Sequence, residues 1–90
     1  MYYVYLIESL KNGRYYIGQT DNLEHRIKRH NAGRNVSTKV YLPWEIRWWK
    51  EFETRSEAIK VENKIKRIKK RIVIERYLRE NNFRGVAQSG

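Results

Sequence analysis

The sequence predicts an α+β domain in which a small three-stranded antiparallel sheet is flanked by helices, in the order ββαβαα. Two aromatic and β-branched runs separated by an Asn-Gly turn predict a hairpin, and a third run alternates apolar and polar side chains. Elsewhere, apolar residues recur at helical spacing. Because 90 residues leave room for one modest core, we expect a single domain over residues 1–82 and a disordered tail over residues 83–90.

The hairpin is predicted over residues 2–8 and 14–20. Its Asn-Gly pair tolerates the positive φ that tight hairpin turns require. A two-residue or a four-residue loop would pair residues whose numbers have an odd sum. Because side chains alternate along a strand, Tyr5 and Tyr16 should then point to the same face of the sheet.

A short helix is predicted after the hairpin. Thr20 or Asp21 can cap its start, and Glu24 lies three residues after Asp21, as in a capping box. The helix should run to about Ala32, because Gly33 suits the position just after a helix end. A basic loop over residues 34–43 would follow.

The third strand is predicted over residues 44–53, from its alternating pattern. Ser56 can then cap a long helix that runs to about residue 70, and a further helical segment is expected near residues 72–82. The strand pattern assigns Trp44, Ile46, Trp48 and Phe52 to one side and Glu45, Arg47, Trp49, Glu51 and Glu53 to the other.

The charge balance favours a polyanion as partner. Twenty Lys and Arg against ten Asp and Glu give a net charge of +10. Residues 26–39 hold five basic and no acidic side chains, and residues 55–79 hold ten basic and three acidic ones. A basic, soluble surface like that of ribosomal proteins is the alternative. The lack of cysteine fits a reducing compartment, and no leader or membrane-length apolar stretch is seen, so we expect a cytoplasmic protein without membrane contact.

The first helix places two polar side chains beside its apolar stripe. Leu23, Arg26, Ile27 and His30 follow the i, i+3, i+4, i+7 spacing of one helix face. Arg26 and His30 should therefore lie near the sheet. A snorkelling side chain is the simpler explanation for Arg26, and a favourable interaction with the helix dipole is the simpler one for His30.

The long helix carries one carboxylate at the margin of its apolar stripe. Glu62 lies one turn from both Ala58 and Ile65. A partly buried carboxylate costs free energy unless it is paired or bound to a metal. The alternatives are a divalent cation and a salt bridge, either to Lys66 at i+4 or to a nearby arginine.

Four short motifs together resemble the GIY-YIG nuclease family, and in particular its small stand-alone bacterial members. The resemblance covers about residues 2–72. Two positions depart from it, since Tyr3 replaces a glycine and Ile74 stands where many active members have an asparagine. The matching residues are Tyr3-Val4-Tyr5, Tyr16-Ile17-Gly18, Asn22-Leu23 with Arg26 and His30, and Ser56-Glu57-Ala58 with Glu62, Ile65 and Lys66.

The resemblance implies a metal-dependent endonuclease that hydrolyses DNA phosphodiester bonds, with Glu62 holding Mg²⁺ or Mn²⁺. Arg26 would contact phosphate oxygens. Tyr5 would act as general base and Tyr16 would orient water or phosphate, although the two roles can be exchanged. Because a phenol with a pKa of about 10 is a weak base at neutral pH, either His30 could accept its proton, or Arg26 and the metal could lower the pKa of the phenol. These five side chains should cluster on one concave surface at the sheet face.

The expected partner is nucleic acid, most simply DNA, and no obligate protein partner is inferred. The substrate could be branched, damaged or single-stranded. Alternatives are a non-catalytic nucleic-acid-binding module with the same fold and a protein-interaction or ribosome-associated domain. Trp49 is a further candidate for nucleic-acid contact. The basic residues expected to bind the nucleic acid are Arg29, Arg34, Lys39, Lys66, Arg67, Lys69 and Lys70.

Overall fold

The computed structural model describes residues 1–35 and 38–86. Its elements are β1 (Tyr2–Ser9), β2 (Tyr15–Thr20), α1 (Leu23–Asn31), the 3-10 helix η1 (Lys39–Tyr41), β3 (Trp44–Phe52), α2 (Arg55–Lys66), α3 (Arg71–Glu80) and β4 (Arg84–Gly85). The strands form one antiparallel sheet in the order β2-β1-β3-β4. The α+β prediction is confirmed, with four strands in place of three.

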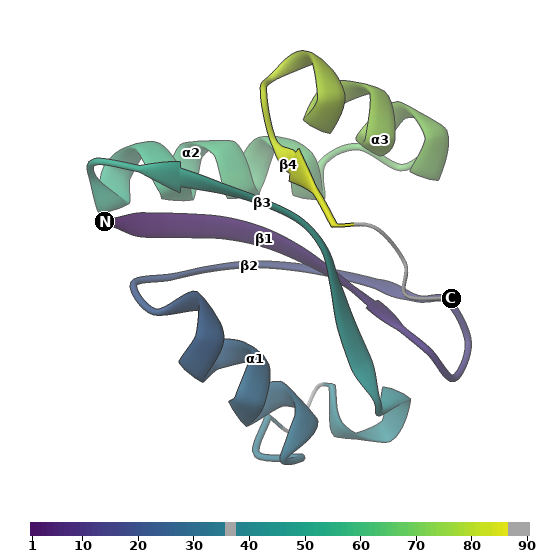
Figure 1. Ribbon diagram of the computed structural model, residues 1–90. Helices are drawn as coiled ribbons and strands as arrows, with labels where there is room; N and C mark the ends of the chain where they lie inside the picture. The colour runs from purple at the N-terminus through teal and green to yellow at the C-terminus, as the bar shows by residue number, and fades with distance from the viewer. Residues whose placement is uncertain (36–37, 87–90) are drawn as a thin grey trace.

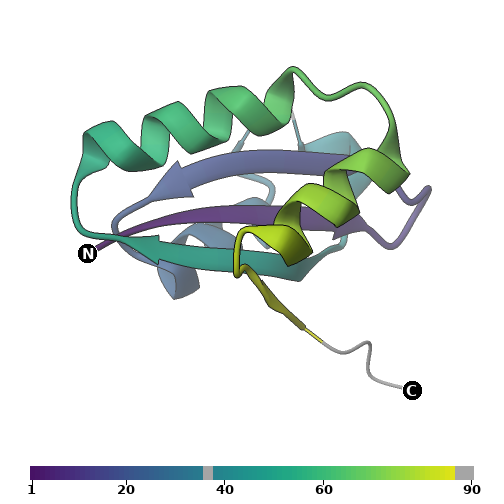
Figure 2. The same ribbon diagram turned by 90° about the horizontal axis from the view of Figure 1, so that it is seen from above.

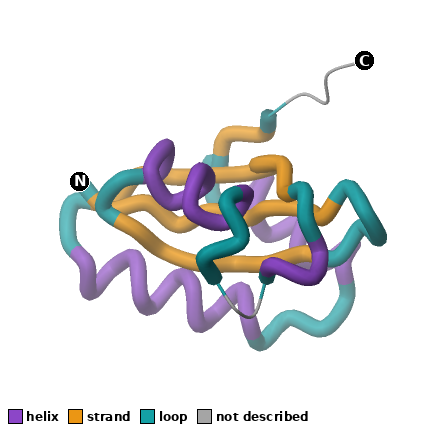
Figure 3. The backbone as a smooth tube through the Cα atoms, turned by 90° about the horizontal axis from the view of Figure 1, so that it is seen from below, coloured by secondary structure: helices purple, strands orange, loops and turns teal. Residues whose placement is uncertain are grey.

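Helices cover both faces of the sheet. Figure 1 shows α2 and α3 above the strands and α1 below them. Seen from above, α2 runs along the β2 side of the sheet and α3 along the β3 side (Figure 2). The view from below shows α1 lying across the opposite face (Figure 3). We call these two sides the α2–α3 face and the α1 face.

The hairpin has the predicted parity. Tyr5 pairs with Gly18 and Ile7 pairs with Tyr16. Opposed residues of an antiparallel pair project to the same side, so Tyr5 and Tyr16 share the α1 face. Gly13 closes the turn with a φ of +76°, a conformation that glycine adopts without steric cost.

The prediction that one side of β3 is apolar is wrong, because the strand contains a bulge. The pairing of β1 with β3 shifts between Leu6 and Ile7, which face Trp48 and Ile46 respectively. One extra residue, Arg47, therefore reverses the alternation. As a result the α1 face receives Trp44, Ile46 and Trp49, while the α2–α3 face receives Trp48 and Phe52.

The start of α1 differs from the prediction by one or two residues. Asn22 is the N-cap in place of Thr20 or Asp21, and its side-chain oxygen accepts a hydrogen bond from the His25 backbone N–H at 3.0 Å. The predicted end is confirmed. Gly33 follows the helix with a φ of +74°.

The long helix is shorter than predicted and starts earlier. Thr54 caps α2 in place of Ser56, and its hydroxyl oxygen accepts from the Glu57 N–H at 3.2 Å. The helix ends at Lys66 instead of near residue 70. A four-residue connection then leads to α3, so the basic stretch 67–70 forms a loop.

The ordered chain extends past the predicted tail boundary at residue 82. Phe83 is buried in the core, and Arg84 and Gly85 pair with Trp49 and Trp48 as the edge strand β4. Residues 87–90 of the predicted tail lie outside the described residues. Within the described ranges, no helix has the length and apolar character needed to cross a membrane.

Each face of the sheet has its own buried cluster. On the α2–α3 face, the buried side chains are Val4, Leu6, Ala58, Ile65, Ile74, Leu78 and Phe83, all apolar. On the α1 face, Tyr5, Ile7 and Trp44 are buried together with the polar side chains of His30 and Thr38. The α1 face therefore buries groups that can carry chemistry.

Candidate functional site

The phenol of Tyr5 lies buried on the α1 face and reaches toward the end of α1. Its Oη atom lies 3.0 Å from His30 Nε2, and both residues are only 1% exposed. The Tyr5 ring lies over Gly18 of the neighbouring strand β2. If Gly18 had a Cβ atom, that atom would lie 2.5 Å from Tyr5 Oη. A glycine at this position therefore lets the phenol meet the imidazole.

A second hydrogen bond fixes the other side of the imidazole. His30 Nδ1 lies 3.0 Å from Thr38 Oγ1. The Thr38 hydroxyl in turn donates to the Asn35 carbonyl oxygen at 3.4 Å, so its oxygen is left to accept from Nδ1–H. These donor and acceptor directions assign the proton of neutral His30 to Nδ1. Its Nε2 is then the acceptor for the Tyr5 hydroxyl proton.

Burial controls the ionisation of both partners. Burial, together with the positive charges of Arg26 and Arg29, lowers the pKa of His30 to about 4, so the imidazole is neutral at pH 7. Burial also raises the pKa of the Tyr5 phenol, an effect that the nearby Arg26 charge opposes. The phenol is thus protonated at neutral pH and needs help to act as a base.

Tyr16 completes the aromatic surroundings of the imidazole. Its ring centroid lies 5.0 Å from that of His30, in an edge-to-face arrangement. The side chain is half-buried at the β2 edge strand. The two tyrosines predicted to act together therefore both contact the same histidine, Tyr5 by a hydrogen bond and Tyr16 through its ring.

Arg26 lies in a cationic hollow next to the histidine. The hollow has a volume of about 230 Å³ and is lined by Arg26, Arg29, His30, Arg34 and Asn35. The Nε atom of Arg26 is buried and has no hydrogen-bond partner among the described residues. An unpaired guanidinium N–H costs free energy that an anionic oxygen would recover, so the hollow is suited to a phosphate group.

Glu62 comes from the opposite side of the sheet. It belongs to α2, whose buried residues pack on the α2–α3 face. Its carboxylate nevertheless contributes to the raised pKa of Tyr5, so it acts electrostatically on the tyrosine cluster. The expectation of a single surface on one sheet face is therefore corrected. Four of the five predicted residues share the α1 face, and Glu62 approaches them from α2.

The salt bridge considered from the sequence is present. Lys66 Nζ lies 2.8 Å from a Glu62 carboxylate oxygen, and the Glu62 side chain is only 14% exposed. Across the described residues, no group of three or more His, Cys, Asp or Glu side chains could hold a metal ion. A single carboxylate fits an ion that keeps most of its waters and takes phosphate oxygens as further ligands, as Mg²⁺ does.

The basic residues predicted to bind nucleic acid fall into two groups. Arg29 and Arg34 line the cationic hollow, and Lys39 follows in η1. The second group lies at the end of α2 and in the loop that leads to α3: Lys66, Arg67, Lys69 and Lys70, all exposed. The two groups therefore come from the two faces of the sheet, as the candidate site residues do.

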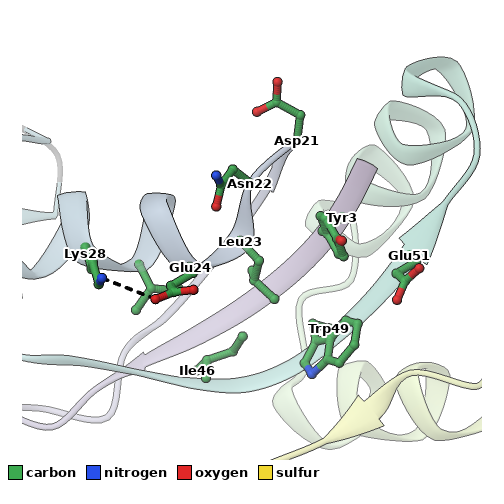
Figure 4. A pocket seen from close by; sticks show the side chains of 10 residues that line it. Tyr3, Asp21, Asn22, Leu23, Glu24, Lys28, Ile46, Trp49 and Glu51 are labelled. Atoms are coloured by element: carbon green, nitrogen blue, oxygen red, sulfur yellow. Dashed lines mark ion pairs between the residues drawn. The ribbon is translucent and has the colours of Figure 1, made fainter. Parts of the chain in front are cut away.

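A larger hollow on the α1 face is lined by none of the five predicted catalytic residues. It measures about 820 Å³ and lies between the start of α1 and β3 (Figure 4). Tyr3 and Trp49 form part of its wall, and Asp21, Glu24 and Glu51 contribute carboxylates. Lys28 also lines the hollow and pairs with Glu24 at 3.2 Å (Figure 4), which leaves the charges of Asp21 and Glu51 uncompensated in the lining. This net negative charge would repel a phosphodiester, so we place the candidate site at the Tyr5–His30 cluster.

Sequence reasoning missed Thr38 and the steric role of Gly18. Thr38 lies in the basic loop, which carried no pattern to mark it as a partner of His30. Gly18 belongs to a recognised motif, but its close approach to Tyr5 depends on the strand register. Trp49 is half-buried against the α1-face cluster, where Arg84 stacks on its ring at 5.2 Å.

Comparison with known proteins supports the resemblance. The family model described as the GIY-YIG catalytic domain matches residues 1–77. A UPF0213 protein of Bacillus licheniformis is 34% identical over 86 residues, covering 94% of this chain and 87% of the relative. A UPF0213 protein of Halobacterium salinarum is 36% identical over 69 residues, covering 76% of this chain and 88% of the relative.

A solved structure has the same fold. The solution NMR structure of a UPF0213 protein from Bacillus halodurans superposes with a TM-score of 0.54 at 28% sequence identity. The match covers 91% of this chain and 86% of the other. The similarity therefore extends over nearly the full length of both chains.

Proposed function

This chain belongs to the GIY-YIG family of nucleases, and from that premise we propose that it is a metal-dependent endonuclease that hydrolyses DNA phosphodiester bonds. The observation that carries the proposal is the buried hydrogen-bonded series Tyr5–His30–Thr38 beside the arginine-lined hollow. A proton acceptor and an anion site next to each other are what phosphodiester hydrolysis requires.

Arg26 is assigned to the scissile phosphate. Its guanidinium presents a planar fork to phosphate oxygens, and its unpaired Nε–H lacks an acceptor in the described part of the chain. Arg29 and Arg34 add positive charge around the same hollow. These groups would neutralise the charge that develops on phosphorus as water attacks.

Tyr5 is assigned as general base, with His30 as the acceptor of its proton. The phenol already donates toward Nε2 across 3.0 Å, so the path of the proton needs no rearrangement. Because the pKa of His30 is low and that of Tyr5 is raised, the transfer would also require Arg26 and a bound cation to lower the pKa of the phenol. Thr38 holds the ring with Nε2 facing the phenol. Tyr16 would orient the water or phosphate. The exchange of roles between the two tyrosines stays open, although only Tyr5 makes the hydrogen bond.

Glu62 is assigned as the metal ligand. A bound Mg²⁺ or Mn²⁺ would supply Lewis-acid stabilisation of the phosphate and would favour the deprotonated phenol. Glu62 would hold it through its carboxylate, and Lys66 would give up its ion pair. The released ammonium of Lys66 is then free for a backbone phosphate, along with Arg67, Lys69 and Lys70.

A non-catalytic DNA-binding module is the second candidate, and two observations favour it. Glu62 already has a counter-ion in Lys66 at 2.8 Å. Ile74, at the position where many active family members carry asparagine, is buried in the apolar cluster of the α2–α3 face. Both observations would be expected of a domain that keeps the fold and charge without a metal.

A cleavage and binding experiment separates the two candidates. Wild-type protein is assayed on duplex, branched and single-stranded DNA with Mg²⁺, with Mn²⁺ and with chelator, next to the variants Glu62→Gln and Glu80→Gln. Glu80 is an exposed carboxylate of α3 and serves as the matched control. We expect Glu62→Gln to abolish metal-dependent cleavage while DNA affinity is equal or slightly higher, because one repulsive charge is lost.

The outcomes assign the function directly. Cleavage that depends on metal and on Glu62, but not on Glu80, supports the nuclease. DNA binding without cleavage of any substrate with either metal would support the binding module. In both cases the logarithm of the affinity should fall linearly with the logarithm of the salt concentration, with a slope of about −0.9 per contacted phosphate of duplex DNA. Weak or salt-independent binding would instead point to the protein-interaction alternative.

A further inference from the structure

A second hollow on the α1 face has an aromatic lining. It measures about 270 Å³ and lies beside the candidate site. Trp44 is 4% exposed, and the rings of Tyr16 and Tyr41 meet it edge-to-face, at centroid distances of 6.3 and 6.2 Å. The lining residues are Arg14, Tyr15, Tyr16, Thr38, Tyr41 and Trp44.

His30 and Thr38 connect this aromatic hollow to the cationic one. Thr38 lines the aromatic hollow, His30 lines the cationic hollow, and a 3.0 Å hydrogen bond joins them. Tyr16 also lines the aromatic hollow and contacts the His30 ring. An arginine-lined site and an aromatic site therefore adjoin one shared pair of side chains. A nucleotide has the same two parts, an anionic phosphate and a flat base.

Tyr41 offers a ring that already has a cation–π contact with a planar side chain. The Arg14 guanidinium carbon lies 4.9 Å from the Tyr41 ring centroid, and Arg14 Nη1 donates to the Tyr41 hydroxyl at 2.9 Å. Both side chains extend toward solvent, since Arg14 is exposed and Tyr41 is half-buried. The lining contains no carboxylate, in contrast to the hollow of Figure 4. Its charge therefore suits a nucleic acid.

We propose that the aromatic hollow binds one unpaired nucleobase of the strand whose phosphate lies at Arg26. The proposal rests on the proposed function and specifies its substrate class. A base inside a duplex is stacked and paired, and it could enter only after it has lost its pairing and stacking, which costs free energy. The hollow therefore makes single strands, flaps and unpaired ends the preferred substrates.

The test compares strands with and without bases. The probes are a fluorescent oligothymidine and a strand of equal length in which abasic nucleotides keep the phosphates. Affinities are measured with chelator present, so that no strand is cut. Tyr41→Leu removes the ring but keeps an apolar side chain. Tyr3→Leu is the matched control. It makes the same change on the same sheet face, but in the carboxylate-lined hollow of Figure 4.

We expect Tyr41→Leu to weaken oligothymidine binding about 5-fold to 150-fold, since stacking contributes roughly 1–3 kcal/mol per base. It should leave the affinity for the abasic strand unchanged. Tyr3→Leu should leave both affinities unchanged. Tyr41→Phe keeps the ring and should restore most of the lost affinity. Thermal unfolding shows whether each variant is folded, and if Tyr41→Leu is not, Tyr41→Phe and the wild-type preference for base-bearing strands carry the test.

Three results would overturn the base site: equal loss of affinity for both strands, no loss for either, or a wild-type protein that binds the abasic strand as tightly as oligothymidine. Cleavage is scored separately. Base-dependent binding through Tyr41 without cleavage would keep the base site and remove the nuclease. Cleavage without any dependence on the base or on Tyr41 would keep the nuclease and remove the base site.

Discussion

The two faces of the sheet bury different kinds of side chain. The cluster of the α2–α3 face consists of aliphatic and aromatic groups from β1, α2, α3 and the segment before β4. The α1 face buries a phenol, an imidazole and a hydroxyl that hydrogen-bond to one another. One sheet thus separates an apolar core from a hydrogen-bonded polar cluster.

This division explains how a small domain stays folded although it buries polar side chains. Buried polar groups stabilise a fold only weakly when their hydrogen bonds are made, and they cost free energy when those hydrogen bonds are missing. The apolar face supplies the stability, so the α1 face can hold Tyr5 and His30 away from water. Substitutions on the two faces should therefore have different consequences.

The largest effect on stability is expected at Leu78, which is fully buried on the α2–α3 face. Leu78→Ala should reduce the free energy of unfolding by about 2–5 kcal/mol, because it removes apolar contacts and leaves a cavity. Urea denaturation measures the change. Ile72→Ala, on the same helix but 64% exposed, is the control and should shift the midpoint little. Equal effects at the two positions would contradict the assigned core.

The next largest effect concerns His30 and depends on pH. The folded protein protonates His30 only near pH 4, whereas the unfolded chain does so near 6.5. Stability is therefore complete above about pH 6.5 and is lost as the pH falls toward 4, by roughly 3 kcal/mol at about 1.4 kcal/mol per pKa unit.

Urea denaturation at a series of pH values checks this expectation. His30→Gln should remove most of the pH dependence between 6.5 and 4. His25→Gln, an exposed position of the same helix, should keep the dependence of the wild type. If both variants behave like the wild type, His30 is not the titrating group.

A smaller effect on stability is expected at Gly18. A methyl group there would lie 2.5 Å from Tyr5 Oη and 2.7 Å from its Cζ atom, so Gly18→Ala must displace the phenol. We expect a loss of about 1–3 kcal/mol in unfolding free energy. Gly85→Ala is a milder control, since its nearest contact, Trp48 Cζ3 at 3.2 Å, is tight but does not overlap as the contacts to Tyr5 do. NMR signals of the His30 ring should shift in Gly18→Ala and not in Gly85→Ala.

Local sequence patterns predicted the hairpin, the order of elements and the shared face of Tyr5 and Tyr16. Each of these depends on neighbouring residues, such as the Asn-Gly turn and the alternation along a strand. The two-sided burial of β3 could not be predicted, because a bulge at Arg47 is set by its pairing with β1. The helix caps were missed by one or two residues because several adjacent side chains can serve.

For the candidate site, the helical spacing predicted that Arg26 and His30 lie on the side of the helix that faces the sheet, and both side chains are found there. The partner of His30 could not be predicted. Thr38 reaches it through the fold of the loop after α1, which has no periodic pattern. The position of Glu62 on the opposite face was also missed, since a helical stripe does not indicate which face of a sheet the helix covers.

The central claim is that Tyr5 and His30 act as one unit in DNA cleavage. Single-turnover rates with Mg²⁺ or Mn²⁺ are to be measured for wild type, Tyr5→Phe, His30→Gln and the double variant, each checked for folding and DNA affinity. The account predicts a loss of about 10²-fold to 10⁴-fold for each single change, and little further loss in the double variant. Full activity in Tyr5→Phe, or losses that multiply in the double variant, would contradict it.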